Sequence, residues 1–231
     1  MNRAAAIILL VFAAGVQTAL AADTEVKSLG FSPEGRYFAF EQRGTDEAGD
    51  YTMTVAMNVA QNRLMKGGAI SHSADDKAKL KQASTTISRL LRRLRVSPRD
   101  VLTVSLRGID IEPFEETSRK LLALPRTWFG PETWLVLQQF KMAIVCQGKD
   151  EKPVGFGLTL ERKTAPPAQL SHDVDIPSSR GCPTHYRVVE AHARKLKDGT
   201  TAFAVIVQNF APGFDATNRN FIAVTALIPK S

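Results

Sequence analysis

The chain has 231 residues, of which 44% are hydrophobic and 23% are charged, and its formal net charge is +7 at pH 7. It contains 15 Gly, 12 Pro and only two Cys. This balance excludes a collagen-like chain, a disulfide-dense miniprotein and a wholly disordered segment, and the length is sufficient for a substantial hydrophobic core.

The first residues have the pattern of an export signal. Arg3 precedes an apolar run over residues 4–15, and residues 19–21 (Ala-Leu-Ala) place small side chains where a signal peptidase reads them. We therefore expect cleavage between Ala21 and Ala22.

The alternative to cleavage is an N-terminal membrane anchor. The apolar run is shorter than the roughly 20 residues that a spanning helix needs, and no Cys follows it as a lipidation site. No later stretch reaches spanning length. The sequence thus predicts a signal peptide over residues 1–21 and one exported domain, periplasmic or secreted, over residues 22–231.

Alternation of apolar and polar residues predicts a three-stranded β-meander between Val26 and Leu64. A first strand contains Leu29 and Phe31, a tight Ser-Pro-Glu-Gly turn covers residues 32–35, and a second strand follows over residues 36–41. After a polar loop, the third strand covers residues 51–59.

The clearest helix is predicted from Ser73 to Arg95, with Ser73 as its N-cap and two aspartates, Asp75 and Asp76, in the first turn. Apolar residues recur at spacings of three and four and form one stripe: Leu80, Ala83, Ile87, Leu90, Leu91 and Leu94. The opposite face is cationic: Lys77, Lys81, Arg89, Arg92, Arg93 and Arg95. We interpret it as a solvated face; docking on anionic lipid is the alternative.

The second half of the chain is predominantly β. We expect a strand over residues 101–106, a short helix over residues 113–122, and a polar, Pro-bearing loop over residues 164–183. The other β runs are residues 133–140, 142–146, 154–160, 186–192, 202–210 and 221–228. The predicted fold is mainly β (α+β), an antiparallel, sandwich-like single domain with one long amphipathic helix and one short helix.

Export determines how the two cysteines are interpreted. In an oxidising compartment Cys146 and Cys182 can pair, which would stabilise the fold by roughly 3–4 kcal/mol on the loop-entropy estimate. The alternatives are free thiols, or a metal site that uses the C-x-x-H spacing of Cys182 and His185. Structural zinc is coordinated by four ligands, so the spacing of two residues is only weak evidence for a metal site.

No catalytic constellation is recognisable. The four histidines lie outside the H-E-x-x-H pattern, and neither a G-x-S-x-G elbow nor a phosphate-binding glycine loop is present. Neighbours in the run Ser171-His172-Asp173 point apart along the chain and cannot form a relay. We expect no catalytic residue, no metal and no cofactor.

Several blocks together resemble one bacterial family of predicted secreted proteins, the domain of unknown function 2259. They are residues 30–41 (GFSPEGRYFAFE), 153–160 (PVGFGLTL), 179–183 (SRGCP) with Tyr186-Arg187, 213–214 and 221–224. Family members have a Cys before the second block and another in the third, so the resemblance supports the Cys146–Cys182 bridge. One departure is the strand at residues 53–59, which no Trp segment follows here. The resemblance implies export and a fold, but no activity.

The first functional hypothesis is a non-catalytic protein of the cell envelope that binds a ligand or partner there. Its partner would be another envelope protein or an anionic envelope component, rather than nucleic acid. The candidate interaction surface is formed by Arg180 and Arg187. The alternative is a periplasmic hydrolase whose site is assembled from distant histidines and acidic residues.

Overall fold

The computed structural model describes residues 24–46, 49–73, 77–106, 117–144, 146, 152–212 and 217–230. The predicted signal peptide and its cleavage site at Ala21 and Ala22 lie outside these ranges. So do Asp75 and Asp76 of the predicted first helical turn.

Twelve strands make up most of the described chain. They are β1 (Glu25–Phe31), β2 (Tyr37–Asp46), β3 (Gly49–Asn58), β4 (Arg63–Ser73), β5 (Leu102–Ser105), β6 (Thr117–Ala123), β7 (Thr133–Lys141), β8 (Val154–Arg162), β9 (Ala165–His172), β10 (His185–Lys195), β11 (Thr201–Pro212) and β12 (Thr217–Ile228). The helices are α1 (Lys77–Leu94), the short α2 (Arg126–Phe129) and a 3₁₀ turn, η1 (Ser178–Arg180).

The strands form three antiparallel sheets of four strands each. Sheet A has the order β1-β2-β3-β4, sheet B the order β12-β11-β10-β5, and sheet C the order β6-β7-β8-β9. Sheets A and C are meanders, whereas sheet B joins the C-terminal strands to β5 from the middle of the chain. The predicted mainly β fold is therefore confirmed.

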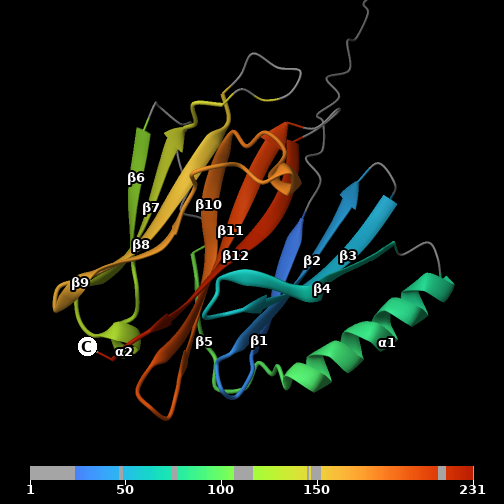
Figure 1. The fold of residues 1–231 in the computed structure, drawn as a ribbon, viewed down its shortest axis with the longest axis horizontal. Helices are drawn as coiled ribbons and strands as arrows, with labels where there is room; N and C mark the ends of the chain where they lie inside the picture. The colour runs from blue at the N-terminus through green and yellow to red at the C-terminus, as the bar shows by residue number, and fades with distance from the viewer. Residues whose placement is uncertain are drawn as a thin grey trace, which may run out of the picture.

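Sheet B is the central layer, with sheet A on one face and sheet C on the other (Figure 1). On β11 the side chains of Phe203, Val205 and Val207 pack toward sheet C. The alternate side chains of Ala204 and Ile206 pack toward sheet A. Because both faces are covered, the first eleven residues of β11 are all buried. A continuous apolar run is what such a strand requires.

Helix α1 adds a fourth layer on the outer face of sheet A (Figure 1). Its C-terminal half supplies Leu90 and Leu94, which are buried against Ala39 of β2 and Ala56 of β3. Leu80, in the N-terminal half, is exposed. The predicted helix is confirmed from Lys77 onward, but Ser73 is the last residue of β4 and not an N-cap.

Four details of the predicted topology were wrong. The meander has a fourth strand, β4. Residues 142–144, where a new strand was predicted, form a loop after the end of β7. The short helix expected at residues 113–122 is replaced, from Thr117 onward, by β6, which pairs with β7 along its whole length. The loop expected at residues 164–183 begins with β9, and its two prolines are accommodated because β9 is the edge strand of sheet C.

A substitution in the central strand tests the layered core. We expect Ile206→Ala to lower the free energy of unfolding by about 2–5 kcal/mol, because a fully buried side chain is removed and its cavity cannot refill. The matched control is Leu121→Ala on edge strand β6, where the side chain is 48% exposed and the loss is expected to stay under about 1 kcal/mol. Urea denaturation measures both; equal losses would contradict the central position of β11.

Candidate binding cleft

A cleft of about 400 Å³ lies along the outer edge of β12, where sheet B ends and sheet A continues beyond it. Most of its lining is apolar: Phe40, Met53, Val55, Met57, Leu64, Ala69, Pro177, Phe221, Ile222 and Ala223. Sheet A supplies one wall from β2, β3 and β4, and η1 with the residue before it supplies another. Clefts of this volume with a mainly apolar lining are typical of sites for small apolar ligands or short chain segments.

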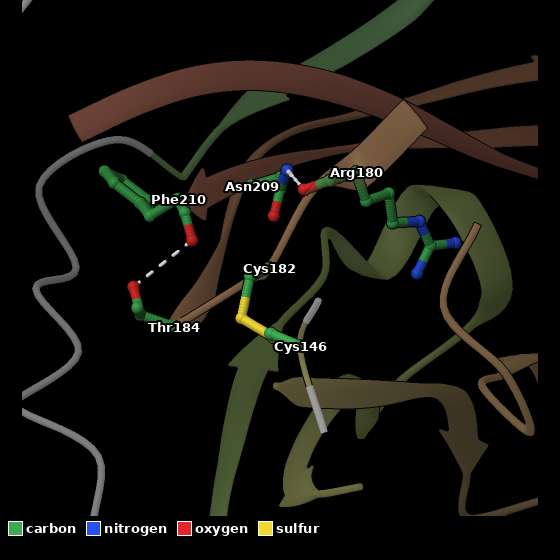
Figure 2. Close-up of a disulfide and its surroundings, with 6 residues drawn as sticks. All are labelled: Cys146, Arg180, Cys182, Thr184, Asn209 and Phe210. Atoms are coloured by element: carbon green, nitrogen blue, oxygen red, sulfur yellow. Dashed lines mark hydrogen bonds between the residues drawn. A yellow bond between two sulfur atoms is a disulfide. The ribbon is translucent and has the colours of Figure 1, made fainter. Parts of the chain in front are cut away.

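Few polar groups reach the cleft, and most are already paired. The side-chain oxygen of Gln42 accepts the backbone N–H of Phe221 at 3.0 Å. Asn209 donates its side-chain N–H to the carbonyl of Arg180 at 3.0 Å (Figure 2). The Asn209 side chain is fully buried, and its amide oxygen has no hydrogen-bond partner among the described residues. That oxygen is itself covered by protein atoms, so the cleft presents mainly apolar surface to a ligand.

Arg180 anchors the η1 turn in the interior. Its guanidinium lies 2.7 Å from the Asp173 carboxylate, and the two side chains are only 14% and 5% exposed. The same guanidinium lies over the rings of Phe156 and Tyr186, at 5.1 and 5.9 Å from their centroids. Asp173 also accepts the backbone N–H of Phe156 at 2.9 Å, so the pair is hydrogen-bonded as a buried ion pair must be.

Two groups of this cluster, Arg180 and Tyr186, have shifted pKa values. Burial disfavours charge on Arg180, but Asp173 and Tyr186 outweigh it and raise the pKa of Arg180 above its ordinary value. Burial also raises the pKa of Tyr186 to about 12, although the neighbouring Arg180 opposes that shift. Near neutral pH the arginine is charged and the phenol is neutral, so neither group exchanges protons there.

The two arginines of the candidate interaction surface have different surroundings. Arg180 is in the interior cluster, whereas Arg187 is half-buried on β10. Arg187 donates to the side-chain oxygen of Gln208 at 2.6 Å and lies over the ring of Phe210. An interaction role for the two arginines stays a prediction.

The predicted bridge between Cys146 and Cys182 is present, with the two Cα atoms 5.8 Å apart (Figure 2). It ties the chain that follows β7 to the turn that carries η1. Close by, Thr184 donates both its N–H and its hydroxyl to the carbonyl of Phe210, at 2.8 and 3.2 Å. The disulfide at Cys182 and the ion pair of Arg180 therefore both hold the C-terminal end of η1. Cys182 is not free to form a metal site with His185.

The histidines are not gathered into one site. His172 stacks on Phe140 and His185 stacks on Phe210. Within the described residues no group of three His, Cys, Asp or Glu side chains is placed to hold a metal ion.

His192 takes part in a different arrangement. Its Nδ1 lies 3.0 Å from the hydroxyl of Thr103, and its Nε2 lies 3.2 Å from the carboxylate of Glu190. A hydroxyl, an imidazole and a carboxylate are the groups of a nucleophile relay, but Nε2 makes no hydrogen bond to any described residue, Glu190 included. The imidazole is only 1% exposed, however, and none of the three residues lines the cleft. We interpret the row as a tie between edge strand β5 and β10.

The cationic face of α1 is exposed as predicted. Lys81, Arg89, Arg92, Arg93 and Arg95 are all on the surface, and Arg95 pairs with Glu34 of the β1–β2 turn. Helix α1 lies on the outer side of sheet A (Figure 1), and none of these five residues lines the cleft.

The sequence did not identify the cleft. Met53, Val55 and Met57 of β3 alternate with other residues as in any half-buried strand. Nothing in this pattern shows that part of the inner face of sheet A extends beyond the edge of sheet B. The only local signal was the Ser-Arg-Gly-Cys-Pro block, which does contribute Ser179 and Arg180 to the lining.

Comparison with known proteins gives one match. A family model described as a predicted secreted protein, domain of unknown function 2259, matches residues 39–226. No curated protein and no solved structure matches the chain. Of the helices in the described ranges, none is both long enough and apolar enough to cross a membrane.

Removing the charge of Asp173 tests the buried ion pair. We expect Asp173→Asn to lower the free energy of unfolding by about 3–5 kcal/mol, because Arg180 would then be a buried cation without a counter-charge. The control is Glu161→Gln, which breaks the solvent-exposed pair with Arg119 and should cost under about 1 kcal/mol. Denaturant unfolding at neutral pH separates the two; a loss at Asp173 no larger than at Glu161 would show that the buried pair is not needed.

Proposed function

The chain belongs to the domain of unknown function 2259 family of predicted secreted proteins, and from this premise we propose that it is a non-catalytic binding protein of the cell envelope. Its ligand occupies the cleft beside β12. The observation that carries the proposal is an open, mainly apolar cleft of about 400 Å³ held between covalently and electrostatically fixed walls.

The chemistry of the cleft favours binding over catalysis. Arg180 is the only lining residue with an ionisable side chain, and its raised pKa removes it as a proton donor or acceptor near neutral pH. The remaining polar groups are amides and a serine hydroxyl. An apolar ligand matches this lining.

A hydrolase is the second candidate, and the row of Thr103, His192 and Glu190 is the observation in its favour. It ranks lower because substrate would have to reach a histidine that is covered by sheet A, where Phe38 lies 5.5 Å from the imidazole. Outside the cleft, the proposed partners are another envelope protein or an anionic envelope component. The exposed cations of α1 support attraction to an anionic envelope component.

A charge placed inside the cleft tests ligand binding. Ala69 is exposed on β4 and lines the cleft, so Ala69→Glu is expected to leave the core intact and to weaken the binding of a naphthalene-based environment-sensitive dye at least about tenfold. Leu121→Glu on exposed β6 is the matched control and should bind the dye as the parent does. Fluorescence titration gives the affinities. An unchanged affinity for Ala69→Glu would overturn the assignment of this cleft.

Export is tested by the intact mass of the protein recovered from its native host, with and without thiol alkylation. We expect a chain that starts at Ala22 and in which neither Cys146 nor Cys182 is alkylated before reduction. A full-length chain with two reactive thiols would contradict export, since disulfides persist in oxidising compartments.

A further inference from the structure

The cleft continues the plane of sheet B past its last strand. Residues of β12 pair with β11 in unbroken register from Thr217 to Ile228, and nothing in the described chain pairs with the other edge of β12 as a strand. Consecutive residues 220–223 all line the cleft, although their side chains alternate between the two faces of the sheet. The cleft therefore straddles the edge of β12 instead of lying on one face.

Two side chains from sheet A show which backbone groups of β12 point outward. Gln42 accepts the N–H of Phe221 at 3.0 Å, and Asn62 accepts the N–H of Thr225 at 2.8 Å. In an antiparallel strand, alternate residues point their N–H and C=O groups the same way. Ala223, midway between these two residues, therefore points its N–H and C=O into the cleft, where no described residue bonds to them.

The walls of the cleft suit a strand in that position. On the face toward sheet A, the side chains of Met53, Met57 and Leu64 form an apolar recess. On the other face lie Pro177 and Ser179 of the η1 segment. A strand beside β12 would direct alternate side chains to these two walls.

One end of this space is closed. Asn62, in the β3–β4 turn, accepts from Thr225 of sheet B and donates to the carbonyl of Leu170 on β9 at 3.5 Å. It thereby links all three sheets beyond Ala223. The space for an added strand is thus short and has a defined end.

Building on the proposed function, we propose that the ligand of this cleft is an extended peptide segment that pairs with the backbone of Ala223 as a fifth strand of sheet B and places an apolar side chain against Met53 and Met57. A peptide supplies both N–H and C=O groups, and buried backbone groups are rarely left without partners. An acyl chain would fill the recess but satisfy none of these groups.

The experiment uses the mature protein, isotopically labelled, and a blocked peptide of about six alternating leucine and threonine residues, a typical strand length. Two further peptides carry N-methyl groups on one or the other set of alternate amides. A neutral maltoside detergent below its micelle concentration is the acyl-chain probe. Chemical-shift titration gives each affinity, and amide hydrogen exchange reports on Ala223.

We expect the unmodified peptide to bind and to slow exchange of the Ala223 amide. One of the two N-methylated peptides should bind at least about tenfold more weakly than the other, because only one set of amides faces β12. If both bind as well as the parent peptide, or if only the detergent binds, the strand inference fails while the proposed binding function stands. If none of the probes binds, both fail.

A variant pair locates the contact on the protein. Ala223→Pro removes the outward N–H without touching the pairing of β12 with β11, and it should abolish peptide binding while detergent binding persists. Leu227→Pro changes the same edge of β12 outside the cleft and should leave peptide binding intact. Equal peptide affinity in both variants would overturn the assignment to Ala223.

Discussion

The double burial of sheet B is the constraint on which the rest of this structure depends. A sheet covered on both faces has no side on which polar side chains can meet water, so β11 is mainly apolar, and its Gln208 and Asn209 side chains hydrogen-bond within the protein. It also means that sheet B cannot be stable without both neighbours, since sheets A and C each cover one of its faces. Side chains of sheet A, such as Gln42 and Asn62, attach it to sheet B by accepting hydrogen bonds from the backbone of β12.

Sheet B can meet solvent or a partner only at its two edges, and they are built differently. The β5 edge is four residues long and is tied to β10 through Thr103 and His192. The β12 edge is twelve residues long, and an unprotected edge of that length invites pairing with other chains. Here two amide side chains occupy two of its outward N–H groups, those of Phe221 and Thr225, and sheet A and η1 enclose the stretch between them. Protection of a long edge and a restricted site for one strand are thus two consequences of the same packing.

The residues around η1 form one wall of that site, and specific bonds, more than apolar packing, hold them in place. The prolines and polar residues of this segment give it little apolar surface of its own. The disulfide to Cys146, the Asp173 carboxylate on Arg180 and the amide of Asn209 hold it instead. Most arginines in proteins are exposed. A carboxylate and two aromatic rings satisfy the charge and the long side chain of Arg180 in the interior.

The sequence by itself determined most of the secondary structure, because a strand or helix with one apolar face shows its period directly: β2, β3, β10 and the C-terminal hairpin, and α1 from its leucine stripe. It also predicted the Cys146–Cys182 pair, since two cysteines can form one internal bridge. Tertiary structure decided the rest. β6 contains good helix formers and β9 contains prolines, and both are strands because β7 and β8 offer them partners. Tertiary structure decided the cleft too. The cleft forms because sheet B ends at β12 while sheet A extends further, and the sequence pattern of neither sheet shows where the other sheet ends.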